Sequence, residues 1–110
     1  MYPDGRSINI CEGQLRTRFR EGFDHERLMK PGSRYPLAID LWSTSMIFNK
    51  GHRLRVQVTS SSDPGFDPNP NTGAPIRSDK RTRIAHNTIY CDTKQGASSI
   101  TLPIVDGSVQ

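Results

Sequence analysis

Hydrophobic and polar residues alternate in several short runs along this chain. In residues 14–20 the apolar Leu15 and Phe19 share one face of a predicted strand, and arginines fill the other. The clearest run covers residues 54–59, where every second residue is aliphatic. Further short runs cover residues 7–11, 35–42, 83–90 and 99–105. A period of two predicts about six β-strands and little helix, which is an all-β antiparallel sandwich.

After the alternating run at residues 54–59 comes a long segment rich in Pro, Asn and Gly, from Ser60 to about Lys80. A structureless connection of this length is uncommon unless it has a function or covers something. Residues 67–71 read Asp-Pro-Asn-Pro-Asn, which resembles the start of a calcium-binding loop. An EF-hand, however, requires Gly and Glu where this chain has Thr72 and Ser78. Asx turns, in which Asp and Asn side chains bond nearby backbone N–H groups, explain these residues better.

The composition leaves little material for a core. The chain has 110 residues, and Leu, Ile, Val and Phe together make up about a fifth of them. We therefore expect one folded piece that obtains part of its core from elsewhere, although independent folding of a lean β-domain stays an alternative. The net charge of +4 is mild, since acidic residues are interleaved with the basic ones.

The sequence offers no convincing catalytic or metal-binding motif. Residues 5–9 and 96–100 come near the Gly-x-Ser-x-Gly nucleophile elbow, but both lack its second glycine. His25, His52 and His86 lack the spacing of metal ligands, so we expect no metal and no cofactor. The two cysteines, 11 and 91, are compatible with one disulfide or with two reduced thiols.

Nucleic-acid binding and membrane insertion are both disfavoured. A stripe of arginines at 16, 18 and 20 is suited to phosphate contacts, but the aromatic residues Phe19, Tyr35 and Trp42 are already assigned to sheet faces. Residues 1–5 have the composition of a turn and lack an apolar run, so we expect no signal peptide there, and no apolar run is long enough to cross a bilayer. We expect a soluble chain, with the cytoplasm slightly favoured.

Most of the chain resembles one family in order along the sequence. The segments that carry the resemblance are 2–6 (Tyr-Pro-Asp-Gly-Arg), 15–20 (Leu-Arg-Thr-Arg-Phe-Arg), 40–45 (Asp-Leu-Trp-Ser-Thr-Ser), Phe48, 51–56 (Gly-His-Arg-Leu-Arg-Val), Ser60, Ser61 and 66–73 (Phe-Asp-Pro-Asn-Pro-Asn-Thr-Gly). Together they are similar to the C-terminal domain of the cocaine esterase / X-Pro dipeptidyl-peptidase serine hydrolases. At residues 63–65 the chain has Asp-Pro-Gly where the family has an aromatic residue, Pro and a basic residue.

This resemblance implies a jelly-roll β-sandwich, also called galactose-binding-like, packed against an α/β-hydrolase domain. The family hydrolyses ester or amide bonds with a Ser-Asp-His triad in the hydrolase part, so none of the triad residues is carried over to this chain. The family's sandwich begins before the turn at residues 2–4. We therefore expect residues 1–110 to hold a C-terminal sandwich that is incomplete at its N-terminus, without the catalytic domain.

The resulting functional hypothesis is a non-catalytic accessory domain of a serine hydrolase that cleaves acyl or X-Pro dipeptidyl bonds. The chain alone is predicted to be inactive, to partner the hydrolase domain of its parent, and to self-associate when made alone. The alternative is a stand-alone ligand- or carbohydrate-binding β-sandwich module. The predicted structural interface residues are His52, Arg53, Phe66, Asp67, Asn69 and Asn71.

Overall fold

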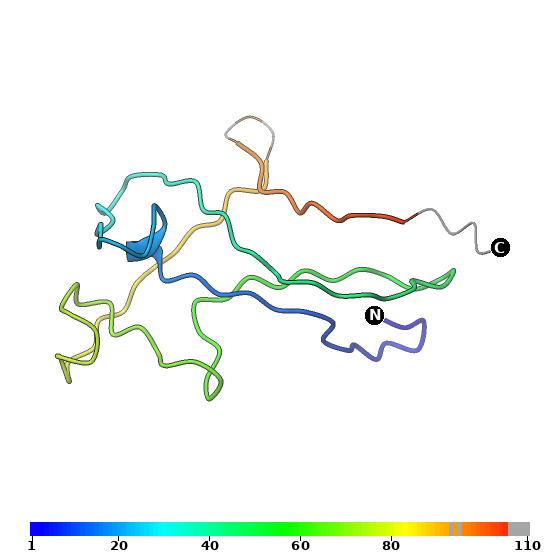
Figure 1. Cartoon of the computed structure of the whole chain (residues 1–110), viewed down its shortest axis with the longest axis horizontal. Helices are drawn as coiled ribbons and strands as arrows, with labels where there is room; N and C mark the ends of the chain where they lie inside the picture. Colours follow the sequence, from blue (N-terminus) through cyan, green and yellow to red (C-terminus); the bar gives the residue numbers. More distant parts are fainter. Residues whose placement is uncertain (93, 95, 106–110) are drawn as a thin grey trace. The chain divides into compact units, whose positions relative to one another are not determined.

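The structure is a computed structural model that describes residues 1–92, 94 and 96–105 (Figure 1). The chain divides into two compact units, Met1–Thr59 and Ser60–Gln110. Among the described residues, the one regular element is the 3-10 helix η1, Thr17–Phe19. It belongs to the first unit.

Helix η1 is a single turn closed by two local hydrogen bonds. The Phe19 N–H donates to the Arg16 carbonyl over 2.8 Å, and the Arg20 N–H donates to the Thr17 carbonyl over 3.3 Å. The chain then turns away at Gly22, whose φ of 143° lies outside the range that suits other residues. Short 3-10 turns of this kind commonly connect extended segments.

Two tight turns meet in the first unit. Residues 2–6 form one of them, with the Tyr2 N–H 2.8 Å from the Arg6 carbonyl. The second reverses the chain at residues 49–52, at the tip of the long green hairpin in Figure 1. Two backbone bonds join the two turns, because the Arg53 N–H donates to the Met1 carbonyl over 2.9 Å and the N-terminal amine of Met1 donates to the Arg53 carbonyl over 2.7 Å.

The first unit also brings two extended segments into close contact at Gly13. A Cβ added there would overlap the Asp40 carbonyl group and lie 3.1 Å from Ile39 Cγ2. Only glycine permits this approach of the two backbones. The segment around residue 13 and the segment around residue 40 therefore lie side by side.

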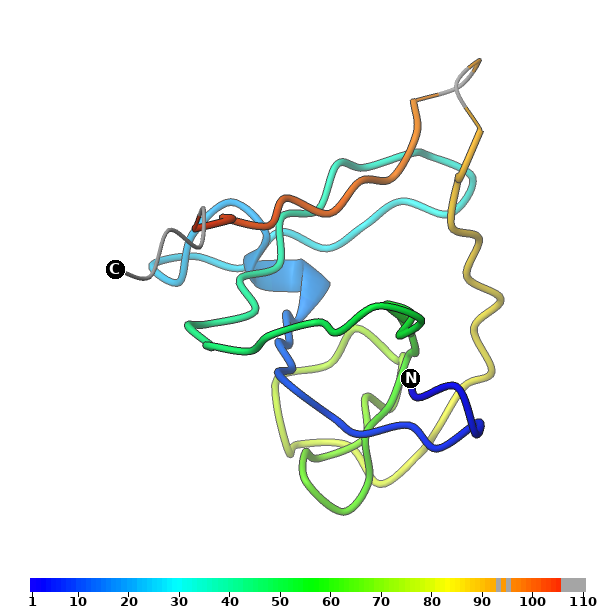
Figure 2. The ribbon, with the colours of Figure 1, turned by 90° about the vertical axis from the view of Figure 1, so that its right-hand side faces the viewer.

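The second unit is built from a long loop and an irregular return. Residues 66–83 form a loop that closes on itself through a bond of 2.8 Å between the Arg83 N–H and the Pro70 carbonyl. Further along, the Ser98 N–H and hydroxyl both donate to the Tyr90 carbonyl, over 3.0 and 2.8 Å. Figure 2 shows the same ribbon turned by 90°.

The predicted all-β jelly-roll, or galactose-binding-like β-sandwich, is wrong for this structure. None of the six predicted runs forms a strand in the described part of the chain. A strand requires a ladder of successive backbone bonds with its neighbour. Here distant segments meet at isolated points: Met1 and Arg53 exchange two backbone bonds, and the Arg83 N–H donates to the Pro70 carbonyl. The described residues continue neither contact into a ladder. The segments are extended in places but are not paired into a sheet.

The apolar faces predicted from the alternation are exposed. This is a second way in which the structure differs from the predicted sandwich. Leu54, Val56 and Val58 are 48%, 56% and 61% exposed, although their spacing predicts one buried face. No residue of the described chain is fully buried. A sandwich is held together by two such faces packed on each other, and the described residues supply no second face.

The run at residues 14–20 differs from its prediction most clearly. Its arginines were expected to face water, but the side chains of Arg18 and Arg20 are only 11% and 8% exposed. They lie among the backbone carbonyls and carboxylates around η1. In the part of the chain that the structure describes, no helix is long and apolar enough to span a membrane.

Candidate functional site

The candidate site is the loop of residues 66–83, which we call the clasped loop. It contains four of the six interface residues predicted from the sequence: Phe66, Asp67, Asn69 and Asn71. The loop begins at a turn in which the Phe66 N–H donates to the Ser62 carbonyl over 3.0 Å. Three sets of polar contacts then fix its shape.

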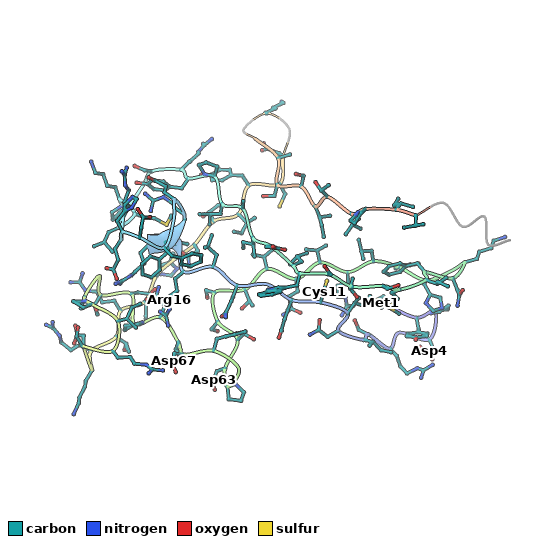
Figure 3. The ribbon with its side chains drawn as sticks, viewed as in Figure 1. Met1, Asp4, Cys11, Arg16, Asp63 and Asp67 are labelled. Carbon is teal, nitrogen blue, oxygen red and sulfur yellow. The ribbon has the colours of Figure 1, made fainter. Side chains whose placement is uncertain are left out.

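The first contact joins Asp67, labelled in Figure 3, to Arg77. Arg77 Nη2 and Nε donate to the same oxygen, Asp67 Oδ2, over 2.6 and 3.0 Å. The hydrogen bond to this carboxylate raises the pKa of the Arg77 guanidinium. Since the Arg77 side chain is 80% exposed, the pair contributes little to stability and mainly sets the loop conformation.

The second contact closes the loop at Asn71. Its side-chain Nδ2 donates to the Arg83 carbonyl over 3.0 Å, beside the backbone bond from Arg83 to Pro70. The Asn71 N–H in turn donates to Asn69 Oδ1 over 3.1 Å. This is an Asx turn, so the sequence-based interpretation of this Asn-Pro-Asn segment is confirmed. Asn71 has φ = 57°, a conformation that asparagine adopts more readily than most residues.

The third contact surrounds the carboxylate of Asp79. It accepts hydrogen bonds from the Arg81 backbone N–H (2.9 Å), Nε (3.1 Å) and Nη2 (3.1 Å). These bonds, together with one from the Thr72 side chain, lower the pKa of Asp79 below its ordinary value. The Asp79 side chain is only 11% exposed.

Asp79 and Arg81 were not among the residues predicted from the sequence. A signal for them does exist, because the same Asp-x-Arg spacing occurs at Asp4 and Arg6. There the Arg6 N–H and Nε donate to the two oxygens of Asp4 over 3.0 and 2.7 Å, which lowers the pKa of Asp4. Figure 3 labels Asp4 in the N-terminal turn.

A cavity of about 290 Å³ opens beside the third contact. It is lined by Thr72, Arg81, Thr82 and Arg83. The hydroxyl and guanidinium groups that these residue types carry recognise oxygen anions.

The remaining two predicted residues, His52 and Arg53, lie in the first unit. The His52 ring packs on the Tyr2 ring with their centroids 4.5 Å apart, and the Arg6 guanidinium lies 4.9 Å from the same Tyr2 ring. Arg53 contributes its backbone N–H to the bond with Met1. These contacts give both residues a structural position at the joint of the two turns. Cys11 and Cys91 are free thiols.

The comparison with known proteins gives the class of this chain. The family model of the X-Pro dipeptidyl-peptidase C-terminal non-catalytic domain matches residues 1–100. The chain belongs to this family of non-catalytic domains, which confirms the resemblance read from its sequence.

A curated relative extends the match. The chain is 40% identical over 107 residues to the cocaine esterase of Rhodococcus sp. (strain MB1 Bresler). The aligned part covers 96% of this chain but only 18% of the length of that esterase. No solved structure matches the chain.

Proposed function

We propose that this chain is the accessory domain of a serine hydrolase that acts on ester or amide bonds, of the acyl or X-Pro dipeptidyl kind. The observation that carries the proposal is the match of residues 1–100 to a domain family described as non-catalytic. The identity to a cocaine esterase supports the hydrolase context. In this proposal the catalytic groups lie in a separate α/β-hydrolase domain, the domain's partner.

The exposed hydrophobic side chains support a role in packing against that partner. Phe23, Trp42 and Ile47 are 85%, 83% and 83% exposed in the first unit. Covering apolar surface contributes about 25 cal/mol per Å² removed from water. Contact with another domain that removes these large side chains from water would therefore lower the free energy.

The clasped loop is the part of the second unit that we assign to the interface. Its polar contacts hold Asn69 and Asn71 in fixed turns, which lowers the entropy that docking would cost. Phe66, with 36% of its surface exposed, supplies an apolar group at the start of the loop. In the first unit, we assign His52 and Arg53, at the joint of the two turns, to the interface as well.

The first test is an activity measurement on the purified chain. We expect no hydrolysis of an activated acyl ester above the buffer rate. Turnover that a serine-directed inhibitor abolishes would contradict the proposal, because it would place a nucleophile inside these 110 residues. A glycan-binding screen tests the alternative of a stand-alone carbohydrate-binding module, and selective binding of one glycan there would favour that alternative.

A further inference from the structure

We propose that the cavity lined by Thr72, Arg81, Thr82 and Arg83 binds a compact oxyanion, a phosphate or a carboxylate. The two guanidinium groups and the Thr82 hydroxyl are the donors. This inference is independent of the proposed accessory function, because it rests on the cavity and the contacts around it.

The donors suit an oxygen anion. A guanidinium carries five N–H groups in a planar fork, and that fork matches the geometry of carboxylate and phosphate oxygens. Asp79 accepts one hydrogen bond from Nε and one from Nη2 of Arg81, so further N–H groups of this guanidinium remain for a ligand. The Thr72 hydroxyl bonds Asp79. In the proposed site Thr72 therefore lines the cavity without donating to the anion, and the Thr82 hydroxyl is the donor.

The loop contacts hold the Arg81 guanidinium and the backbone of Arg83 in place before a ligand arrives. Arg81 is fixed at its backbone N–H and at its guanidinium by one carboxylate, that of Asp79. Arg83 is fixed at its N–H by the Pro70 carbonyl and at its carbonyl by Asn71. Preorganised donors of this kind reduce the entropy lost on binding.

Charge and size both favour a small anion. Arg81 and Arg83 carry two positive charges against the single negative charge of Asp79, so these three groups are net positive. A volume of about 290 Å³ lies just below the range for ligand pockets, roughly 300–1,000 Å³. The space suits a small anion better than an extended peptide.

The test uses the 110-residue chain, titrated with inorganic phosphate and, in a second series, with acetate. Chloride keeps the ionic strength constant, so that general screening does not change. Amide NMR signals report the binding site residue by residue. We expect saturable shifts at residues 81–83 with at least one of the two anions, and the tighter of the two identifies the preferred chemistry.

Three variants make the test specific. Arg83→Gln is expected to weaken binding at least tenfold, and Thr82→Val about threefold, because each removes a donor. Lys80→Gln removes an adjacent charge outside the cavity lining and is expected to change the affinity less than twofold. Hydrogen-exchange protection of the residue-83 amide, bonded to Pro70, shows whether the loop is retained in each variant.

Two results would overturn the proposal. One is the absence of saturable shifts at residues 81–83 with either anion. The other is an equal loss of affinity in Lys80→Gln and Arg83→Gln, since this would show a diffuse attraction to positive charge without a site. If Arg83→Gln loses the loop, the Thr82→Val variant decides alone, and unchanged affinity there counts against the site.

Discussion

Short Asp-x-Arg sequences make well-defined local contacts in both units of this chain. At Asp4 and at Asp79 the carboxylate accepts the backbone N–H and the guanidinium of the arginine two residues later. The two sites differ in exposure, because the Asp4 side chain is 52% exposed and that of Asp79 only 11%. The carboxylate of Asp79 is therefore the more shielded of the two, while its partner Arg81 is 87% exposed.

The pKa of Asp79 provides a prediction at this scale. Since its pKa is lowered in the folded chain, the Asp79 contact stabilises the loop above the ordinary aspartate value of about 3.9. That contribution is lost as the pH falls through the lowered pKa. In the Arg81→Gln variant, carboxyl NMR is expected to find the pKa of Asp79 raised toward its ordinary value. An unchanged pKa in that variant would show that Arg81 is not the cause.

Asn71 offers a second prediction for a single residue. Replacing it with alanine removes the bond to the Arg83 carbonyl and puts an unfavourable residue at φ = 57°. We expect a loss of about 2 kcal/mol of local loop stability, from roughly 1 kcal/mol for each effect. Asn71→Gly keeps the backbone freedom and is expected to lose only about half of this.

Hydrogen exchange at the Arg83 amide measures both Asn71 variants. Its protection reports the bond to the Pro70 carbonyl, which closes the same loop. Equal protection in Asn71→Ala and in the unmodified chain would show that the side-chain bond does not hold the loop.

At the scale of elements, the surroundings of η1 are organised by a charged side chain. Arg20 donates to the carbonyls of Thr17 (3.1 Å) and Arg27, and its guanidinium lies 4.5 Å from the centre of the Tyr35 ring. It also pairs with Glu21 over 3.2 Å. The Arg27 N–H meanwhile donates to the Arg18 carbonyl over 2.8 Å. The Arg20 side chain thus contacts residues from Thr17 to Tyr35.

Replacing this arginine tests the role. Arg20→Met keeps most of the aliphatic stem but removes the donors and the charge. Bonds to charged groups contribute about 1.5–3 kcal/mol each, so the protection of the Arg27 amide is expected to fall at least tenfold. Arg53→Met is the matched control, since its side chain lies outside this cluster. Equal losses in the two variants would contradict the role of Arg20.

Contacts between residues close in sequence were predictable from the sequence, whereas contacts between more distant residues were not. The local chemistry of Asn69 and Asn71 was predictable, because an Asx turn involves residues two apart. The burial of Arg18 and Arg20 was not, because it depends on carbonyls and carboxylates supplied by residues 21–27. The strand prediction failed for a related reason. Alternation specifies a face, but a sheet also needs backbone partners and a second layer.

The candidate site was predicted in part for the same reason. The resemblance and the length of the Pro/Asn/Gly segment both indicated the loop that holds Asp67 and Asn71. The cavity formed by Arg81 and Arg83 escaped prediction. The contacts around it join residues from different points along the loop: Asp79 bonds the Arg81 guanidinium, and Pro70 and Asn71 bond the backbone of Arg83.

At the scale of the whole chain, exposed hydrophobic surface is the feature that matters most. Ile84 and Ile104 are 89% and 87% exposed in the second unit, as Phe23 and Trp42 are in the first. Surfaces of this kind favour association. We therefore expect the chain made alone to self-associate, with a sedimentation coefficient that rises with concentration. A sedimentation coefficient that keeps the value of a monomer across the micromolar range would contradict this prediction.

We propose that this chain supports a hydrolase without supplying its chemistry. The most direct measurement replaces the matching 107-residue segment of the Rhodococcus cocaine esterase with this chain. Its controls are the unmodified esterase and an esterase from which the segment is deleted. Ester turnover and the thermal midpoint are then measured for all three proteins. We predict that the chimera recovers most of the turnover and of the thermal midpoint that the deletion loses. A chimera no more stable and no more active than the deletion would contradict the claim.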